Sequence, residues 1–185
     1  YLQRIEKMLS GMLVRKPVRL DDVSDLVREQ LFDVDLEGND LNIWLYQTAR
    51  IVISFGHCGV LVDAPKEGEK ARPYWVTYKP SDILGWRTEI IDGARVLTQV
   101  RLLEKVVEPD GAYGEKNITQ VRVLERGRYE IHRKDDKKGE YKLVEEGEMS
   151  LKDKIPFAVA YSNRVGFYES RSPLYDIAEL NLKHY

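Results

Sequence analysis

His57 and Cys58 are the first residues whose types could do chemistry, either as a nucleophile with its base or as metal ligands. They are adjacent, between an expected helix and an expected strand, and adjacent residues of an extended chain point to opposite sides. A metal site needs three or four ligands, and the other histidines, His132 and His184, have no ligand-like neighbours in the sequence. We therefore interpret His57 and Cys58 as part of a structural turn.

Carboxylates near strand ends could hold the metal ions of a nuclease. Such an enzyme needs carboxylates at the ends of adjacent strands, with a lysine two residues after the second one. Asp63 follows an expected strand and Asp82 approaches one, whereas Glu69 and Asp136 lie near lysines in charged loops. No expected strand supports these lysines, so the motif is incomplete. A metal-dependent nuclease that uses Asp63 or Asp82 stays the alternative from another class.

The sequence contains no nucleotide-binding motif of the GxxxxGK[ST] or GxGxxG kind. The stretch GRYEIHRKDDKKG is basic in part, and its Tyr129 could stack on a base, but acidic residues interrupt it and we interpret it as a solvated hairpin. We expect Trp44 in the core and burial, rather than ligand contact, for Trp75 and Trp86. The sequence thus predicts no catalytic residue, no metal and no cofactor, which favours a structural protein over an enzyme.

The stretch SPLYDIAELNLKHY, residues 172–185, predicts a helix with an apolar side. Ser172 suits the N-cap and Pro173 the first helical position. We expect its apolar side to fold back, to pair with another copy, or to fray. The candidate packing surface consists of Leu174, Ile177, Ala178 and Leu180.

Helical periodicity continues through the first third of the chain. Apolar residues at helical spacing predict a helix from residue 1 that ends near Gly11, and residues 21–31 predict a second, shorter one. The clearest helix runs from Asp40, its cap, to Gly56, its stop. Its apolar arc is so wide that we expect it near the centre of the core. Its main stripe consists of Leu41, Trp44, Leu45, Thr48, Ile51, Val52 and Phe55.

After residue 57 the pattern changes to short strands. GVLVD and RPYWVTYK each predict a strand, and PSDILGWR predicts one helical turn that leads into a further strand. A period of two then predicts an antiparallel meander of about four strands over residues 95–147, with Val96, Thr98, Val100 and Leu102 on one face. IPFAVAY predicts a final strand. The class is α+β, with N-terminal helices packed on an antiparallel sheet and a C-terminal helix that leaves the domain.

Bulk composition limits the possible functions. The 185 residues include 31 acidic and 29 basic ones, a balance that shows no general affinity for nucleic acid. Cys58 is the one cysteine, so no disulfide framework can form. No apolar run reaches the ~20 residues of a membrane span. The chain opens at Tyr1 within a helical pattern, and we interpret it as a fragment of a longer protein.

Four segments, taken in order, resemble one family of phage and prophage proteins that was long catalogued only as a domain of unknown function. They are GMLVRKPVRL, LEGNDLNIWLYQTARIVISFGHCGVLVDAPKEG, PYWVTYKPSDILGWR and IPFAVAYSNRVGFYESRSPLYDIAELNLKHY. The family is related to the portal proteins of tailed bacteriophages. The meander at 95–147 carries no diagnostic motif.

This resemblance implies a structural ring component. Portal proteins form rings, typically of twelve subunits, at one capsid vertex, where DNA is packaged and ejected. Residues 1–171 would be a wing-like α+β domain, helical over 1–57 and β-rich over 58–162. Residues 172–185 would begin a stem helix, and the rest of the stem and the clip would follow Tyr185. The resemblance assigns no catalytic residues to this chain.

The same resemblance implies the partners and the location. The partners would be further copies of the chain, the large terminase, and capsid and connector or tail proteins. DNA would pass through the channel without specific binding, and no membrane would be involved. The protein would reside in the virion at the capsid vertex, and in the host cytoplasm during assembly. A monomeric head-tail adaptor is a further alternative.

Overall fold

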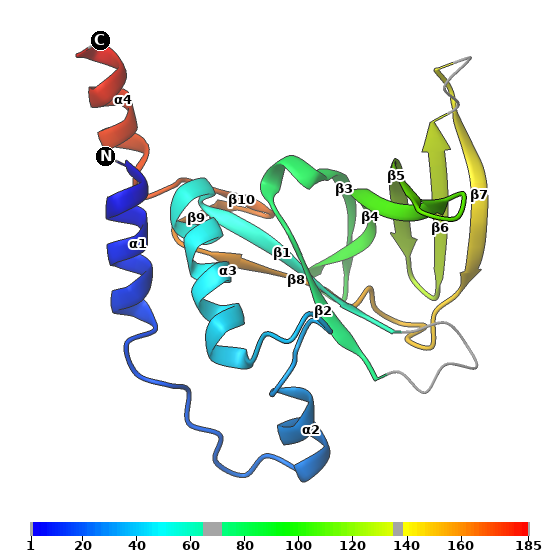
Figure 1. The fold of residues 1–185 in the computed structure, drawn as a ribbon, viewed down its shortest axis with the longest axis horizontal. Coiled ribbons are helices and arrows are strands. Elements are labelled where there is room, and N and C mark those ends of the chain that lie inside the picture. The colour runs from blue at the N-terminus through cyan, green and yellow to red at the C-terminus, as the bar shows by residue number, and fades with distance from the viewer. Residues whose placement is uncertain (1, 65–71, 135–138, 185) are drawn as a thin grey trace. The chain divides into compact units, whose positions relative to one another are not determined.

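The computed structural model describes residues 2–64, 72–134 and 139–184. The chain divides into two compact units, which we describe separately. Unit 1 comprises residues 1–80 and 157–185, and unit 2 comprises residues 81–156. Figure 1 shows the helices and strands of both. In the described part of the chain, no helix is long and apolar enough to cross a membrane.

The described residues of unit 1 form the helices α1 (Leu2–Leu13), α2 (Asp25–Gln30), α3 (Leu41–Phe55) and α4 (Tyr175–Lys183). The predicted boundaries of α3 are confirmed, since the Asp40 side chain accepts a hydrogen bond from the backbone N–H of Ile43 and Gly56 ends the helix. The predicted end of α1 near Gly11 is two residues short. The second helix is shorter than residues 21–31, because Ser24 provides its N-cap.

Helix α1 packs on α3 through a polar contact. Glu6 is 7% exposed, and its carboxylate binds Arg50 of α3 at 2.6 Å. Ser10 is fully buried, and its Oγ donates to the carbonyl of Glu6 over 2.8 Å. A buried carboxylate needs such a partner, because burial without one would cost several kcal/mol, on the order of 3–5. The pair therefore fixes which side of α1 faces α3.

The sheet of unit 1 is antiparallel, in the order β2-β1-β8. Its strands are β1 (His57–Asp63), β2 (Tyr74–Tyr78) and β8 (Phe157–Tyr161). Phe157 lies over Gly59 of β1, where an added Cβ would come within 2.1 Å of the Phe157 ring. A short pair, β9 (Arg164–Gly166) and β10 (Glu169–Ser170), precedes α4. The core of this unit includes Val34, Trp44, Ile53, Cys58, Leu61, Tyr78, Phe157, Tyr168 and Leu174.

Unit 2 is a five-stranded antiparallel meander whose spatial order follows the sequence. Its strands are β3 (Ile83–Ile91), β4 (Ala94–Asp110), β5 (Gly114–Glu125), β6 (Arg128–Lys134) and β7 (Tyr141–Glu148). A short turn, η1 (Pro80–Asp82), leads into β3, as predicted. The predicted four-strand meander is confirmed as β4–β7, and β3 adds a fifth strand. The α+β class is likewise confirmed.

One face of the meander mixes apolar and charged side chains. Leu102 is fully buried and pairs across the strands with Arg122, so the two share a face, and the period of two adds Glu104 and Gln120 to it. Gln120, 4% exposed, donates to Glu104 over 2.8 Å, and Arg122 binds the same carboxylate at 2.9 Å. Strand periodicity alone did not predict this network, because its partners come from different strands.

Candidate functional site

The C-terminal end of α3 is joined by serine hydroxyls to the segment that leads into α4. Ser172 Oγ donates to the carbonyl of Ile53 over 2.7 Å. Ser162 donates to the carbonyl of Gly56 twice, from its backbone N–H over 2.8 Å and from its Oγ over 2.9 Å. Carbonyls at a helix end lack intrahelical partners, so these bonds satisfy them. The α4 joint, as we name it, consists of Ile53, Gly56, His57, Ser162, Ser170, Ser172 and Leu174.

Gly56 allows the joint to close. Its φ of +94° lies in the region that favours glycine. A Cβ at this position would lie 2.5 Å from Ser170 Oγ and 3.0 Å from backbone atoms of both Arg171 and Ser172. Glycine is therefore required at this position for two reasons, the positive φ of the backbone and the close approach of Ser170, Arg171 and Ser172.

His57 belongs to the joint and Cys58 does not. His57 Nδ1 lies 2.8 Å from Ser170 Oγ, and burial lowers the pKa of the imidazole. Cys58 is fully buried, and burial raises the pKa of its thiol to about 11, so the thiol stays protonated at neutral pH. The expected turn at these residues is wrong: Gly56 makes the turn, and His57 already pairs with Tyr161 as the first residue of β1.

Helix α4 begins later than predicted. Ser172 Oγ accepts a hydrogen bond from the backbone N–H of Leu174 over 3.0 Å, but its own hydrogen goes to Ile53. The next backbone bond, from Tyr175 N–H to the Ser172 carbonyl, closes only a three-residue turn. The first α-helical bond runs from Ala178 N–H to the Leu174 carbonyl, so the helix starts at Tyr175. The predicted N-cap at Ser172 is therefore wrong.

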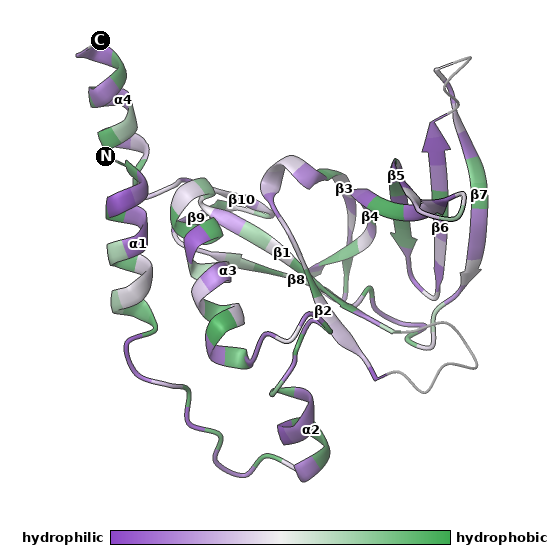
Figure 2. Cartoon of the chain, in the orientation of Figure 1, coloured by the Kyte–Doolittle hydropathy of each residue, from purple (hydrophilic) through white to green (hydrophobic). Residues whose placement is uncertain are grey.

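The residues of the predicted packing surface divide between the joint and the open side of α4. Leu174 is 6% exposed and lies in the core, whereas Ile177 is 38% and Leu180 57% exposed. Ala178 is half-buried. No residue from Tyr175 to Lys183 is fully buried, and the hydrophobic bands of α4 alternate with hydrophilic ones in Figure 2.

Leu182 was missed by the sequence analysis. It is 79% exposed and lies seven residues after Tyr175, which is 53% exposed, so both fall on one side of the helix. At the base of the helix, Arg171 stacks on the Tyr175 ring at 4.7 Å and binds Asp176 at 2.6 Å. The signal that could have found Leu182 is this spacing of seven. Ile177 and Leu180 lie on the opposite side, because two residues turn a helix by about 200°. The open side of α4, as we name its exposed apolar residues on both of these sides together, consists of Tyr175, Ile177, Leu180 and Leu182.

The carboxylates considered for a nuclease are not brought together within either unit. Asp63 of unit 1 accepts a hydrogen bond from the Tyr74 hydroxyl over 3.2 Å. Asp82 of unit 2 accepts one from Ser81 over 3.3 Å. Glu69 and Asp136 lie outside the described residues. Among the residues that the structure describes, no group of three or more His, Cys, Asp and Glu side chains could hold a metal ion.

The aromatic residues considered for ligand binding have internal contacts. The Tyr129 hydroxyl donates to Glu145 over 3.0 Å, and its ring lies against Gly147. Trp44 is 7% exposed, which confirms its place in the core, and it meets Trp75 edge to face with ring centroids 4.8 Å apart. Trp86 is half-buried. The basic tip of the Tyr129 hairpin lies partly outside the described residues.

No protein-family model matches this sequence, and no curated protein is significantly similar to it. The candidate functional site is therefore defined by geometry alone. It consists of the α4 joint, which is closely packed and hydrogen-bonded, and the open side of α4, which is exposed and apolar. Such a pair of features can hold a binding surface in a fixed direction.

Proposed function

We propose that this chain is a subunit of a portal-like ring at the capsid vertex of a tailed phage, and that it acts by assembly with further copies. The observation that carries the proposal is the open side of α4, whose Leu180 and Leu182 are 57% and 79% exposed. Large side chains of this kind gain about 1.5–3 kcal/mol each when they are fully buried. Leu180 and Leu182 lie on opposite sides of the helix, so one neighbouring helix on each side would provide that burial.

The α4 joint supports the same proposal. A helix that packs against other subunits must leave its domain in a defined direction, and Gly56, Ser162 and Ser172 tie the base of α4 to α3. Under the proposal, residues 1–171 are wing-like and residues 172–185 begin a stem. Large terminase, capsid and connector or tail proteins are the partners that the resemblance implies, and DNA passes without specific contacts.

The test is the mass of the assembled protein. A chain extended past Tyr185 is expected to form a closed ring, typically of twelve subunits, in native mass measurement and electron microscopy. Leu180→Asp combined with Leu182→Asp should abolish the ring without unfolding the subunit, because both side chains are exposed. Leu151→Asp, which adds one aspartate where the test variant adds two, is the control for replacing an exposed leucine, since Leu151 is 46% exposed in unit 2.

Two results would contradict the proposal. An extended chain that stays monomeric at high concentration would instead indicate an adaptor. Cleavage of DNA in the presence of magnesium or manganese, lost in Asp63→Ala, would indicate a nuclease.

A further inference from the structure

The exposed charges of α1 and of the segment after it are all positive. Glu6, the one acidic residue from 2 to 20, is 7% exposed and binds Arg50 at 2.6 Å. It therefore adds no exposed negative charge. Met8, Met12 and Leu13 of α1 are 58%, 67% and 69% exposed. This surface, which we name the basic face, consists of Arg4, Lys7, Met8, Met12, Leu13, Arg15, Lys16 and Arg19.

The next twenty residues have the opposite charge. Residues 21–40 contain eight acidic residues and one basic residue, Arg28. Some of the acids act within the chain, since Asp33 binds Arg72 at 3.0 Å and Asp40 caps α3. Five others are exposed, and Leu26 and Phe32 beside them are 68% and 73% exposed. The acidic segment, as we name this surface, consists of Asp21, Asp22, Asp25, Leu26, Glu29, Phe32, Leu36 and Glu37.

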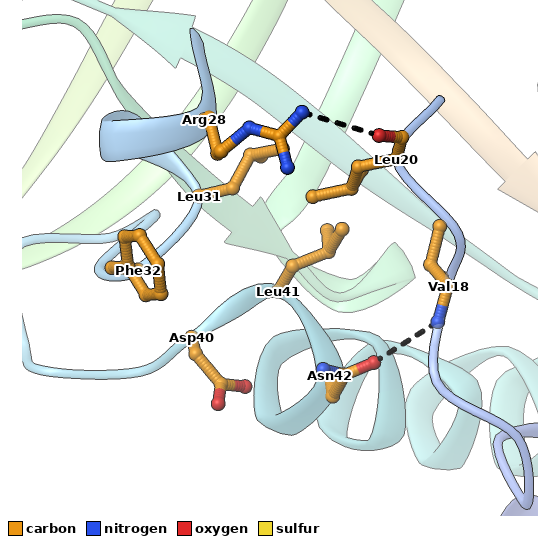
Figure 3. A pocket seen from close by; sticks show the side chains of 8 residues that line it. All are labelled: Val18, Leu20, Arg28, Leu31, Phe32, Asp40, Leu41 and Asn42. Carbon is orange, nitrogen blue, oxygen red and sulfur yellow. Dashed lines mark hydrogen bonds between the residues drawn. The ribbon is translucent and has the colours of Figure 1, made fainter. Parts of the chain in front are cut away.

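The acidic segment borders a small apolar pocket, drawn in Figure 3. Its volume is about 110 Å³. Ligand pockets usually measure roughly 300–1,000 Å³, so this one suits a single side chain rather than a cofactor. Arg28 lies across one side and donates to the carbonyl of Leu20 over 3.4 Å. The lining residues are Val18, Leu20, Arg28, Leu31, Phe32, Asp40, Leu41 and Asn42.

Within one copy, α1 and the acidic segment contact different parts of α3. Glu6 of α1 binds Arg50, whereas the acidic segment meets the first turn, where Leu41 N–H donates to the Leu31 carbonyl over 2.9 Å. Nine residues separate Arg50 from Leu41, which is about 14 Å along a helix axis. The α1 part of the basic face therefore lies along α3 away from the acidic segment of its own copy, whereas the segment after α1 places Val18 and Leu20 in the pocket lining.

We propose that the basic face of one copy docks on the acidic segment of the next copy. Charge complementarity selects a second copy as the occupant, because both surfaces belong to this chain and have opposite signs. An exposed methionine such as Met12 can fill the side-chain-sized pocket, since methionine adapts to irregular gaps. The contact joins two different patches, so it is heterologous and can close into a ring. It rests on the proposed ring assembly and names the contact between its wings.

Reversing the charges tests the contact directly. One variant carries Lys7→Glu, Arg15→Glu and Lys16→Glu, and the other carries Asp21→Lys, Asp25→Lys and Glu29→Lys. Each alone should lose self-association of the 185-residue chain by about tenfold or more in sedimentation, because like charges then face each other. An equimolar mixture should recover it, since both contacts between unlike copies are attractive. The control with the same charge change in unit 2 is Arg95→Glu, Lys105→Glu and Lys134→Glu.

Salt and a neutral variant provide further readouts. Raising the salt from about 0.1 M to about 1 M shortens the Debye length from about 10 Å to about 3 Å and should weaken association of the wild-type chain. Met12→Gln changes no charge and should also weaken it. Circular dichroism of every variant checks its fold, and Met12→Gln keeps the test decisive if a charge reversal unfolds the chain.

Several outcomes would overturn the contact. The contact would be refuted if the wild-type chain stayed monomeric at low salt, or if both charge-reversal variants associated as strongly as the wild type. It would also be refuted if the equimolar mixture of the two variants did not recover self-association. Competition for the basic face by anionic vesicles or duplex DNA would refute it as well. The proposed ring is judged separately. A chain extended past Tyr185 that forms rings despite both reversals would refute this contact and leave the ring in place, whereas an extended wild-type chain without rings would refute the proposed function.

Discussion

The α4 joint and the open side of α4 lie a few residues apart and differ in almost every physical property. At the joint, Leu174 is 6% exposed and Ser172 has a hydrogen-bond partner for both its donor and its acceptor. On the helix, Leu182 is 79% exposed. Leucine therefore serves two purposes within nine residues. Burial at the joint stabilises the fold, whereas exposure on α4 leaves apolar area available for a contact between copies.

Binding and stability are thereby assigned to different residues of one short segment. Substitutions at the joint should lower the free energy of unfolding, and substitutions on the open side should change association alone. Surface substitutions away from caps and buried contacts usually change stability by no more than about 0.5 kcal/mol. Three substitutions at the joint, each with a control at an exposed or open position, and one pH measurement test this separation, in order of decreasing effect.

Leu174→Ala should give the largest effect. Removing a buried leucine side chain costs its transfer free energy and leaves a cavity, about 3 kcal/mol in total. Chemical denaturation of the 185-residue chain measures the loss. Leu182→Ala is the matched control, because the same atoms are removed from an exposed position, and it should weaken association without this loss. Equal destabilisation by the two variants would show that α4 is buried in solution and would remove the comparison.

Gly56→Ala should cost about 2 kcal/mol, from backbone strain at positive φ and from the clash with the segment at Ser170. Gly11→Ala provides the control, since nothing lies within 4 Å of an added Cβ there. Alanine in the helix interior should even stabilise α1 by about 0.5–1 kcal/mol. Thermal unfolding shows whether each variant has a lower or a higher melting temperature than the wild-type chain. If Gly56→Ala left the stability unchanged, the segment that contains Ser170 would have to shift without cost to make room for the added Cβ.

Local signals in the sequence predicted the elements well and their long-range contacts poorly. The caps Asp40 and Gly56 and the alternation of the meander are local, and both predictions are confirmed. Ser172 carries an N-cap signal, but its hydroxyl bonds to Ile53, which lies 119 residues away in sequence. A cap rule cannot anticipate such a partner. The helix therefore begins at Tyr175, two residues later than its local signal indicated.

The candidate site was predicted only in part for the same reason. Helical spacing identified an apolar side on the last segment, but it could not divide Leu174, which the joint buries, from Leu180, which remains exposed. That division depends on where α3 and the segment before α4 meet. The network of Glu104 and Gln120 in unit 2 was missed because strand register, rather than periodicity, brings those side chains together.

Ser172→Ala should cost about 1–2 kcal/mol, less than the two preceding changes. It removes the donor to the Ile53 carbonyl and the acceptor for Leu174 N–H, and a buried polar group left without its partner costs about this much. Ser150→Ala in unit 2 is an exposed control and should be silent. Urea denaturation of both variants gives the comparison. Equal midpoints would show that water replaces the Ser172 bonds at no cost.

The contribution of His57 to the pH dependence of stability should give the smallest effect, and His57 lies in the joint. Burial holds the pKa of His57 below its ordinary value of 6.5, so the unfolded chain takes up a proton before the folded chain does. Above pH 6.5 both states are neutral and the contribution is constant, whereas below pH 6.5 the free energy of unfolding should decrease until the folded pKa is passed. Denaturation of the wild-type chain and of His57→Gln between about pH 8 and about pH 5 isolates this dependence. Leu180 and Leu182 do not titrate, so association through these side chains should not follow the same curve. If both quantities fell together with pH, the joint and the open side would act as one unit, and the separation of stability from assembly would be lost.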